Sequence, residues 1–204
     1  MRNVTVAAVQ MKCSKSVEKN IAHAEELVRQ AAAKGAEIVL LPELFERPYF
    51  CQERRYEYYE YAQTAEENPA VRHFSRVAAE LGIVIPVSFY EKEVNNTYNS
   101  VAVLDADGKN LGVYRKTHIP DDHYYQEKFY FTPGDTGFKV LIPDLEPLEL
   151  ESAGISGSRK RQDVWHCREQ SFSFIPLPSE VNPSWNATAW NTGEDVCRDT
   201  LPPT

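Results

Sequence analysis

Four consecutive apolar residues, 38–41, followed directly by Pro42 and Glu43, constrain the fold more than any other stretch of the chain. A short run without polar residues is typical of a strand buried on both faces, and it ends at Pro42 because proline cannot donate to a central ladder. In an open α/β sheet, ligands bind just beyond the carboxyl ends of the strands. Glu43 stands at such a place, and the apolar residues 44–45 after it favour a carboxyl group with a raised pKa, suited to a general base. The alternative is a solvated loop glutamate.

The segment before this strand predicts a βα unit. Residues 4–11 are β-branched and nearly all apolar, which indicates a strand. From Val17 onward apolar residues recur at helical spacing; Ser14 or Ser16 can cap this helix, and Gly35 can end it. A strand, a helix and a second strand in close succession predict a parallel pair with a right-handed crossover.

A second helix and a further strand follow. Asn68 and Pro69 provide an N-cap and a first helical residue, and Gly82 provides the helix end. Residues 83–90 predict a strand, in which Pro86 indicates either a bulge or a position that needs no ladder bond.

An antiparallel hairpin is expected next, so the sheet should be mixed. Residues 99–104 and 111–114 flank a turn at residues 105–108 that ends in Asp-Gly, a strong hairpin signal. The sequence holds neither of the glycine motifs that bind phosphate groups. Residues 53–61, rich in tyrosine and charge, predict a short amphipathic surface helix, with a ligand-facing aromatic patch as the alternative.

The composition disfavours several classes of function. The 204 residues include 42% hydrophobic residues, enough for a core in one domain or two. The formal net charge of −8 disfavours nucleic-acid and anionic-membrane partners. No apolar run approaches a membrane span and no signal-peptide pattern opens the chain, so we expect a cytoplasmic protein. The cysteines lack the spacing of a zinc site and are expected to be free thiols; they are Cys13, Cys51, Cys167 and Cys197.

Several motifs in residues 1–140 together resemble a known enzyme family. A lysine follows a strand end in VYRKTHIP (113–120), as Glu43 follows the earlier strand. With VTVAAVQM (4–11), IVLLPELF (38–45) and YYQEKFYFTPGDTGFKV (124–140), in this order, the segment resembles the nitrilase-type carbon–nitrogen hydrolases. The sequence motif ELFERPYFCQ (43–52) is most similar to that of the N-carbamoylputrescine amidase subfamily.

The resemblance implies an α/β fold, the αββα sandwich of the nitrilase type, of which residues 1–140 would form the N-terminal half. It implies that Glu43 is a base that deprotonates a thiol, that Lys116 stabilises an oxyanion, and that Glu127 positions the lysine and the substrate. The thiolate would attack a ureido or amide carbonyl of a small molecule, ammonia would leave, and water would hydrolyse the thioester. For N-carbamoylputrescine the products are putrescine, ammonia and carbon dioxide. The resemblance implies neither a cofactor nor a metal, and it leaves a homo-oligomer open.

The family's nucleophile, a cysteine in Gly-Ile-Cys-Trp-Asp, is expected soon after residue 140 and is missing from the sequence. Residues 141–204 show no sustained strand or helix pattern, so we expect an aberrant tail without its own core. A shifted reading frame explains this tail. Read one base earlier, the codons of residues 148–160 permit Gly-Ile-Cys-Trp-Asp-Gln-Trp-Phe-Pro-Glu, with the cysteine codon straddling Ser152 and Ala153. The hypothesis is that one base was lost near codon 141, in the gene or in its sequencing.

As written, the chain has a base and a lysine without a nucleophile, so we expect it to be inactive. Cys51 is the best substitute, yet it is expected to be structural, as are His118 and His123. Poor solubility is also expected, because half of the sandwich would leave sheet faces and edges uncovered. Three interpretations stay open. They are a defective copy of a hydrolase, a non-catalytic pseudogene product or inactive subunit of family oligomers, and, least favoured, a two-domain protein with a binding tail.

Overall fold

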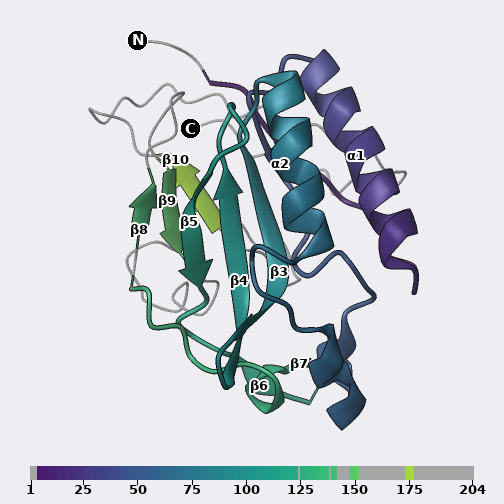
Figure 1. Ribbon diagram of the computed structural model, residues 1–204, viewed down its shortest axis with the longest axis vertical. Helices are drawn as coiled ribbons and strands as arrows, with labels where there is room; N and C mark the ends of the chain where they lie inside the picture. The colour runs from purple at the N-terminus through teal and green to yellow at the C-terminus, as the bar shows by residue number, and fades with distance from the viewer. Residues whose placement is uncertain (1–3, 124, 138, 142–147, 152–172, 177–204) are drawn as a thin grey trace, which may run out of the picture.

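The structure is a computed structural model in which strands and α-helices alternate as far as residue 93, after which strands follow one another without a further α-helix in the described residues (Figure 1). It describes residues 4–123, 125–137, 139–141, 148–151 and 173–176. In chain order the elements are β1 (Val6–Ala8), α1 (Val17–Ala33), β2 (Ile38–Leu40), the 3₁₀ helices η1 (Phe50–Gln52) and η2 (Tyr56–Tyr61), α2 (Pro69–Leu81), β3 (Ile85–Glu93), β4 (Asn96–Leu104), β5 (Asn110–Arg115), β6 (Asp121–Asp122), β7 (Tyr125–Gln126), η3 (Glu127–Phe129), β8 (Lys139–Leu141), β9 (Leu148–Glu151) and β10 (Ser173–Pro176).

A mixed sheet forms the centre of the described structure. β1 pairs in parallel with β2, and a parallel bridge between Ile38 and Val84 joins β2 to the start of β3. β3, β4 and β5 then follow as antiparallel neighbours. β8, β9 and β10 form a second antiparallel sheet whose strand β8 lies beside β5, and β6 pairs with β7 at one end of the molecule (Figure 1).

The two long helices lie side by side against one face of the central sheet (Figure 1). Ser16 caps α1 and Asn68 caps α2, each by accepting a hydrogen bond from a backbone N–H in the first turn. Gly82 ends α2 in a left-handed conformation, with φ +65°. The main core lies between helices and sheet; its members include Ile21, Leu27 and Val28 of α1, Val71, Phe74 and Val77 of α2, and Ile85, Val87, Phe89, Ala102 and Leu104 of the sheet.

The other face of the sheet changes from apolar to polar toward the carboxyl end of β3. Residues on this face alternate with those that face the helices. Its directly opposed pairs on β3 and β4 are Pro86–Val103, Ser88–Val101 and Tyr90–Asn99. Because β2, β3 and β5 run in the same direction, their carboxyl ends share one edge of the sheet. Glu43 and Lys116 follow two of these ends.

Most of the predicted elements are confirmed. Both helices begin and end as expected, and the hairpin formed by β4 and β5 turns at Gly108, with φ +84°. The strand predicted at residues 4–11 is shorter, although the N–H of Val9 still donates to the carbonyl of Leu40. Neither described α-helix is long and apolar enough to span a membrane.

The region around β3 corrects one expectation and, for Pro86, confirms the second of two alternatives, a position that needs no ladder bond. β3 continues to Glu93 and turns into β4 through the exposed Val94, a hairpin that the sequence did not predict because valine disfavours the left-handed φ of +51° found there. Pro86 causes no bulge, since the pairing of β3 with β4 is continuous through it. The backbone nitrogen of Pro86 lies on the side of β3 that is turned toward β2. The hydrogen bonds of Val84 to residues 37 and 39 are the last between these two segments, so no N–H is needed at Pro86.

Two further segments differ from expectation. The predicted surface helix at residues 53–61 is the 3₁₀ helix η2, which has no buried residue. The short strands β9 and β10 lie in the tail, where no strand was predicted. The alternation of leucine and glutamate in β9 covers only four residues, which is too short to stand out in a sequence.

Candidate active site

Three charged side chains meet at the polar edge of the sheet, and they are the three that the sequence indicated. The ammonium nitrogen of Lys116 lies 3.0 Å from Oε1 of Glu43, and 2.9 and 3.2 Å from the two carboxylate oxygens of Glu127. Their side chains are only 3%, 5% and 0% exposed, respectively. A fully buried cluster of one lysine and two glutamates is costly to desolvate, and its burial is typical of a functional site.

The loop after β2 holds Glu43 through an unusual backbone conformation. Leu44, the next residue, has φ +52°, a left-handed conformation rare for leucine. Its buried N–H donates to Oγ of Ser88 on β3, at 3.0 Å. Two residues further on, the carboxylate of Glu46 accepts a hydrogen bond from Asn68, which ties the loop to the start of α2.

Replacing Ser88 with alanine should destabilise the chain by about 1–3 kcal/mol, because it leaves the buried N–H of Leu44 unsatisfied. Urea unfolding measures the loss, and amide hydrogen exchange at Leu44 should become faster than at the neighbouring core amides. Thr117→Val is the matched control, since the buried hydroxyl of Thr117 has no hydrogen-bond partner among the described residues. Equal effects of the two substitutions would show that the bond to Leu44 is unimportant.

The end of β5 holds Lys116 by its backbone on both sides. Its N–H donates to the carbonyl of Asn99, and its carbonyl accepts from the N–H of Gly134, both at 2.8 Å. Gly134 must be glycine here, because a Cβ would lie 2.1 Å from the carbonyl oxygen of Arg115. The loop that carries Gly134 thus packs directly against the last residues of the strand.

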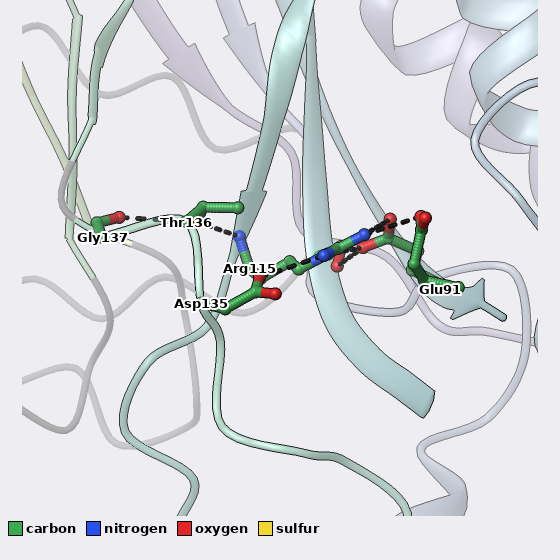
Figure 2. Close-up of polar contacts among 7 residues, drawn as sticks. Glu91, Arg115, Asp135, Thr136 and Gly137 are labelled. Atoms are coloured by element: carbon green, nitrogen blue, oxygen red, sulfur yellow. Dashed lines mark hydrogen bonds and ion pairs between the residues drawn. The ribbon is translucent and has the colours of Figure 1, made fainter. Parts of the chain in front are cut away.

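Arg115, one residue earlier, points to the opposite face of the sheet and fixes the strand end there. Figure 2 shows its guanidinium bound by both oxygens of Glu91, at 2.7 and 2.8 Å, and by Asp135 at 3.0 Å. A further bond reaches Glu93, and the N–H of Arg115 donates to Oγ1 of Thr136 (Figure 2). These contacts join β3, β5 and the loop at residues 134–136 next to Lys116.

Glu127 opens the short helix η3 and uses both of its carboxylate oxygens. Each accepts from Lys116, and Oε1 also accepts from the hydroxyl of Tyr49 at 2.7 Å. The ring of Tyr49 lies against that of Tyr125, with centroids 6.2 Å apart. Behind them a cluster of aromatic side chains surrounds Phe50; it includes Tyr58, Tyr61, Tyr90, Tyr130 and Phe131.

Burial and charge set the protonation of the cluster. Burial raises the pKa of Glu43 above its ordinary value; Lys116 opposes this rise and Glu127 adds to it. For Lys116, burial acts to lower the pKa, but the two glutamates outweigh it and the pKa is raised. Lys116 is therefore a permanent cation at neutral pH, while Glu43 has an increased affinity for a proton.

The two glutamates differ in the oxygen that each leaves available. Oε2 of Glu43 is buried and has no hydrogen-bond partner among the described residues, whereas both oxygens of Glu127 accept from Lys116. Chemically, Glu43 can accept a proton through Oε2, Lys116 can stabilise a developing negative charge beside it, and Glu127 can orient the lysine. No group of three or more metal-binding side chains occurs within the described ranges.

The described cysteines and histidines lie outside this chemistry. Cys51 is buried, and burial together with Glu127 raises the pKa of its thiol, which keeps it protonated and unreactive. Cys13 is half-buried, and burial raises the pKa of this thiol too. His118 and His123 are exposed loop residues, while Cys167, Cys197 and the Ser152–Ala153 junction lie outside the described residues.

Sequence reasoning missed three residues of the site. Asn99 donates to Glu43, Tyr49 donates to Glu127, and Ser88 holds the loop between them. Asn99 and Ser88 are polar residues at strand positions that turn away from the helices, a signal that becomes visible only once the strand pairing is known. Tyr49 stands in the motif ELFERPYFCQ, but nothing in its spacing points to Glu127.

Known protein sequences are similar to the part of the chain that carries this site. The chain matches the Carbon-nitrogen hydrolase family model over residues 5–151. It is 53% identical over 140 residues to N-carbamoylputrescine amidase from Arabidopsis thaliana, covering 69% of this chain and 47% of that protein. A citrullinase from Francisella tularensis is 46% identical over 140 residues, with 69% and 49% covered.

Solved structures of the same family are also similar to this fold. A crystal structure of a carbon–nitrogen hydrolase from Helicobacter pylori superposes with a TM-score of 0.66 at 35% identity, covering 70% of this chain and 49% of that one. The chain spans about half the length of the curated relatives it matches. The family model matches most of this chain, and the fold is the α/β fold of the nitrilase type. The chain therefore belongs to the carbon–nitrogen hydrolase family.

Proposed function

We propose that the chain derives from an amidase that hydrolyses N-carbamoylputrescine to putrescine, ammonia and carbon dioxide. The observation that carries this proposal is the buried cluster of Glu43, Lys116 and Glu127, in which one carboxylate oxygen lacks a donor among the described residues. The identities of 53–56% to four plant N-carbamoylputrescine amidases, against 46% to the citrullinase, support this substrate over citrulline.

The proposed mechanism uses a cysteine thiol supplied to the open side of Glu43. Oε2 takes the thiol proton, the thiolate attacks the ureido carbonyl, and Lys116 stabilises the oxyanion. Ammonia leaves with a proton returned by Glu43, and the cysteine is left as an S-thiocarbamate that still holds the putrescine nitrogen. Glu43 then activates water, which hydrolyses the thiocarbamate and releases the thiol. The resulting carbamate decomposes to putrescine and carbon dioxide, so one water is consumed for each ammonia released.

We also propose that the reading frame is shifted after about codon 141, so that the translated chain lacks the catalytic cysteine of this site. The frameshift hypothesis supplies the missing cysteine at the Ser152–Ala153 junction, and Cys51 is a poor replacement because its thiol is buried and protonated. This observation favours a second candidate, a non-catalytic product or an inactive subunit of a family oligomer. Both candidates hold together if one base was lost: the gene then descends from an active amidase, and its present product is inactive.

Two measurements test these proposals. The shifted frame requires a Ser152 codon that ends in T before the GC of Ala153; any other base there contradicts the frameshift. Ammonia release from N-carbamoylputrescine should then be absent for the present chain and present for a protein translated in the restored frame. Release by the present chain that disappears in Cys51→Ala would overturn our assignment of the nucleophile, and release from citrulline alone would overturn the substrate.

A further inference from the structure

Asn99 is a fully buried polar residue of β4 that contacts both charged partners at the centre of the site. Its side-chain amide donates to Oε1 of Glu43 at 2.6 Å, and its backbone carbonyl accepts the N–H of Lys116 at 2.8 Å. The first of these is a bond to a charged acceptor, the stronger kind.

The side chain of Asn99 is not needed for strand pairing in the sheet. Its backbone pairs with Tyr90 on β3, so an apolar side chain would serve the ladder equally well and would cost less to bury. Within the described part of the chain Glu43 is its one hydrogen-bond partner, and Oδ1 has none. A buried amide retained at this cost therefore serves the carboxylate that it touches.

Two donors converge on the same oxygen of Glu43. Asn99 and Lys116 both donate to Oε1, and Oε2 has no hydrogen-bond partner within the described ranges. We propose that Asn99 is a positioning residue that fixes the Glu43 carboxylate by Oε1 and directs Oε2 toward the reacting group. This inference rests on the proposed function, in which Glu43 is the base.

A neutral donor suits this position better than a charged one. The groups that face Glu43 are Lys116, Glu127, Tyr49 and Cys51, of which one is a cation and one is a second carboxylate. A second cation would lower the proton affinity of Glu43 and weaken the base, whereas an amide holds the ionised carboxylate without adding charge.

The test measures Glu43 directly in the 204-residue chain, by the pH dependence of its side-chain carboxyl ¹³C signal in glutamate-labelled protein. A hydrogen bond to a charged group is worth about 1.5–3 kcal/mol, so Asn99→Ala should raise the titration midpoint by about 1–2 pH units. Asn99→Asp should raise it further by adding a carboxyl group. Ser100→Ala, which removes a buried hydroxyl donor on the opposite face of β4 that does not contact Glu43, should leave the midpoint unchanged.

A merely structural asparagine would lower the melting temperature and leave the midpoint in place, and that result would overturn the proposal. If Asn99→Ala does not fold, Asn99→Ser is measured instead, since its hydroxyl is too short to reach Glu43. Failure of both to fold would likewise assign a structural role. The result is independent of turnover: a restored-frame protein that hydrolyses no ureido compound would refute the proposed function without moving the Glu43 midpoint.

Discussion

Replacing Lys116 with methionine should destabilise the folded chain by about 3–5 kcal/mol at neutral pH, as expected when one partner of a buried ion pair is removed. The substitution nearly preserves volume, so the loss comes from two buried carboxylates, Glu43 and Glu127, that keep no cation between them. Urea unfolding at pH 8 and at pH 5 measures it. The loss should be smaller at pH 5, because the carboxyl group of Glu43, whose pKa burial raises, can then take up a proton.

Lys109→Met is the matched control. Lys109 forms an ion pair with Asp107, but its side chain is 80% exposed, so removal of its charge should change stability little. An equally small effect at Lys116 would mean that the cluster is hydrated and open, contrary to its burial. A variant that combines Lys116→Met with Glu43→Gln and Glu127→Gln should recover part of the loss, because these three positions then carry no buried charge.

Replacing Glu43 with glutamine should separate catalysis from stability. In the restored-frame protein, loss of the general base should lower kcat by about 10²–10⁴-fold. In the present chain the same change should cost little or even stabilise, because it removes one of two buried negative charges that share a single lysine. Residual activity near the wild-type level would exclude Glu43 as the base.

The stability effect of Glu43→Gln should depend on pH in a defined direction. The folded-state pKa of Glu43 is raised above the ordinary value of 4.5, so the unfolded chain loses this proton first as pH rises. Ionisation of Glu43 therefore reduces the stability of the wild-type protein from about pH 4.5 upward. The glutamine variant lacks this contribution and keeps that of Glu46, whose pKa burial also raises. Lys116 adds no slope in this window, because its raised pKa keeps it protonated. Denaturant midpoints of the two proteins between pH 4 and pH 8 give the test: parallel curves would contradict the raised pKa.

Local patterns predicted the helices, because their caps and end signals are formed by adjacent residues. Ser16, Asn68 and Gly82 act in the structure as their residue types indicate. The polar partners of the site were not predictable in this way. Asn99 meets Glu43 across 56 positions, through two strand pairings and the conformation of Leu44, and no local rule assigns φ +52° to a leucine. Glu43, Lys116 and Glu127 themselves were found through the order of several motifs, since each alone reads as an ordinary surface residue.

The placement of Arg115 and Lys116 on opposite faces of one strand has a consequence for how the chain folds. A slip of one residue between β4 and β5 would turn Lys116 toward Glu91 and the helices, and Arg115 toward Glu43. In the native register Arg115 satisfies Glu91 on one face while Lys116 satisfies Glu43 on the other. A slipped hairpin would bring an ammonium group to Glu91, whose two oxygens each accept a hydrogen bond from the guanidinium of Arg115, and an ammonium group cannot reproduce that planar pair of bonds. We therefore expect the same charges that form the site to favour the native register of β4 and β5 over a register slipped by one residue.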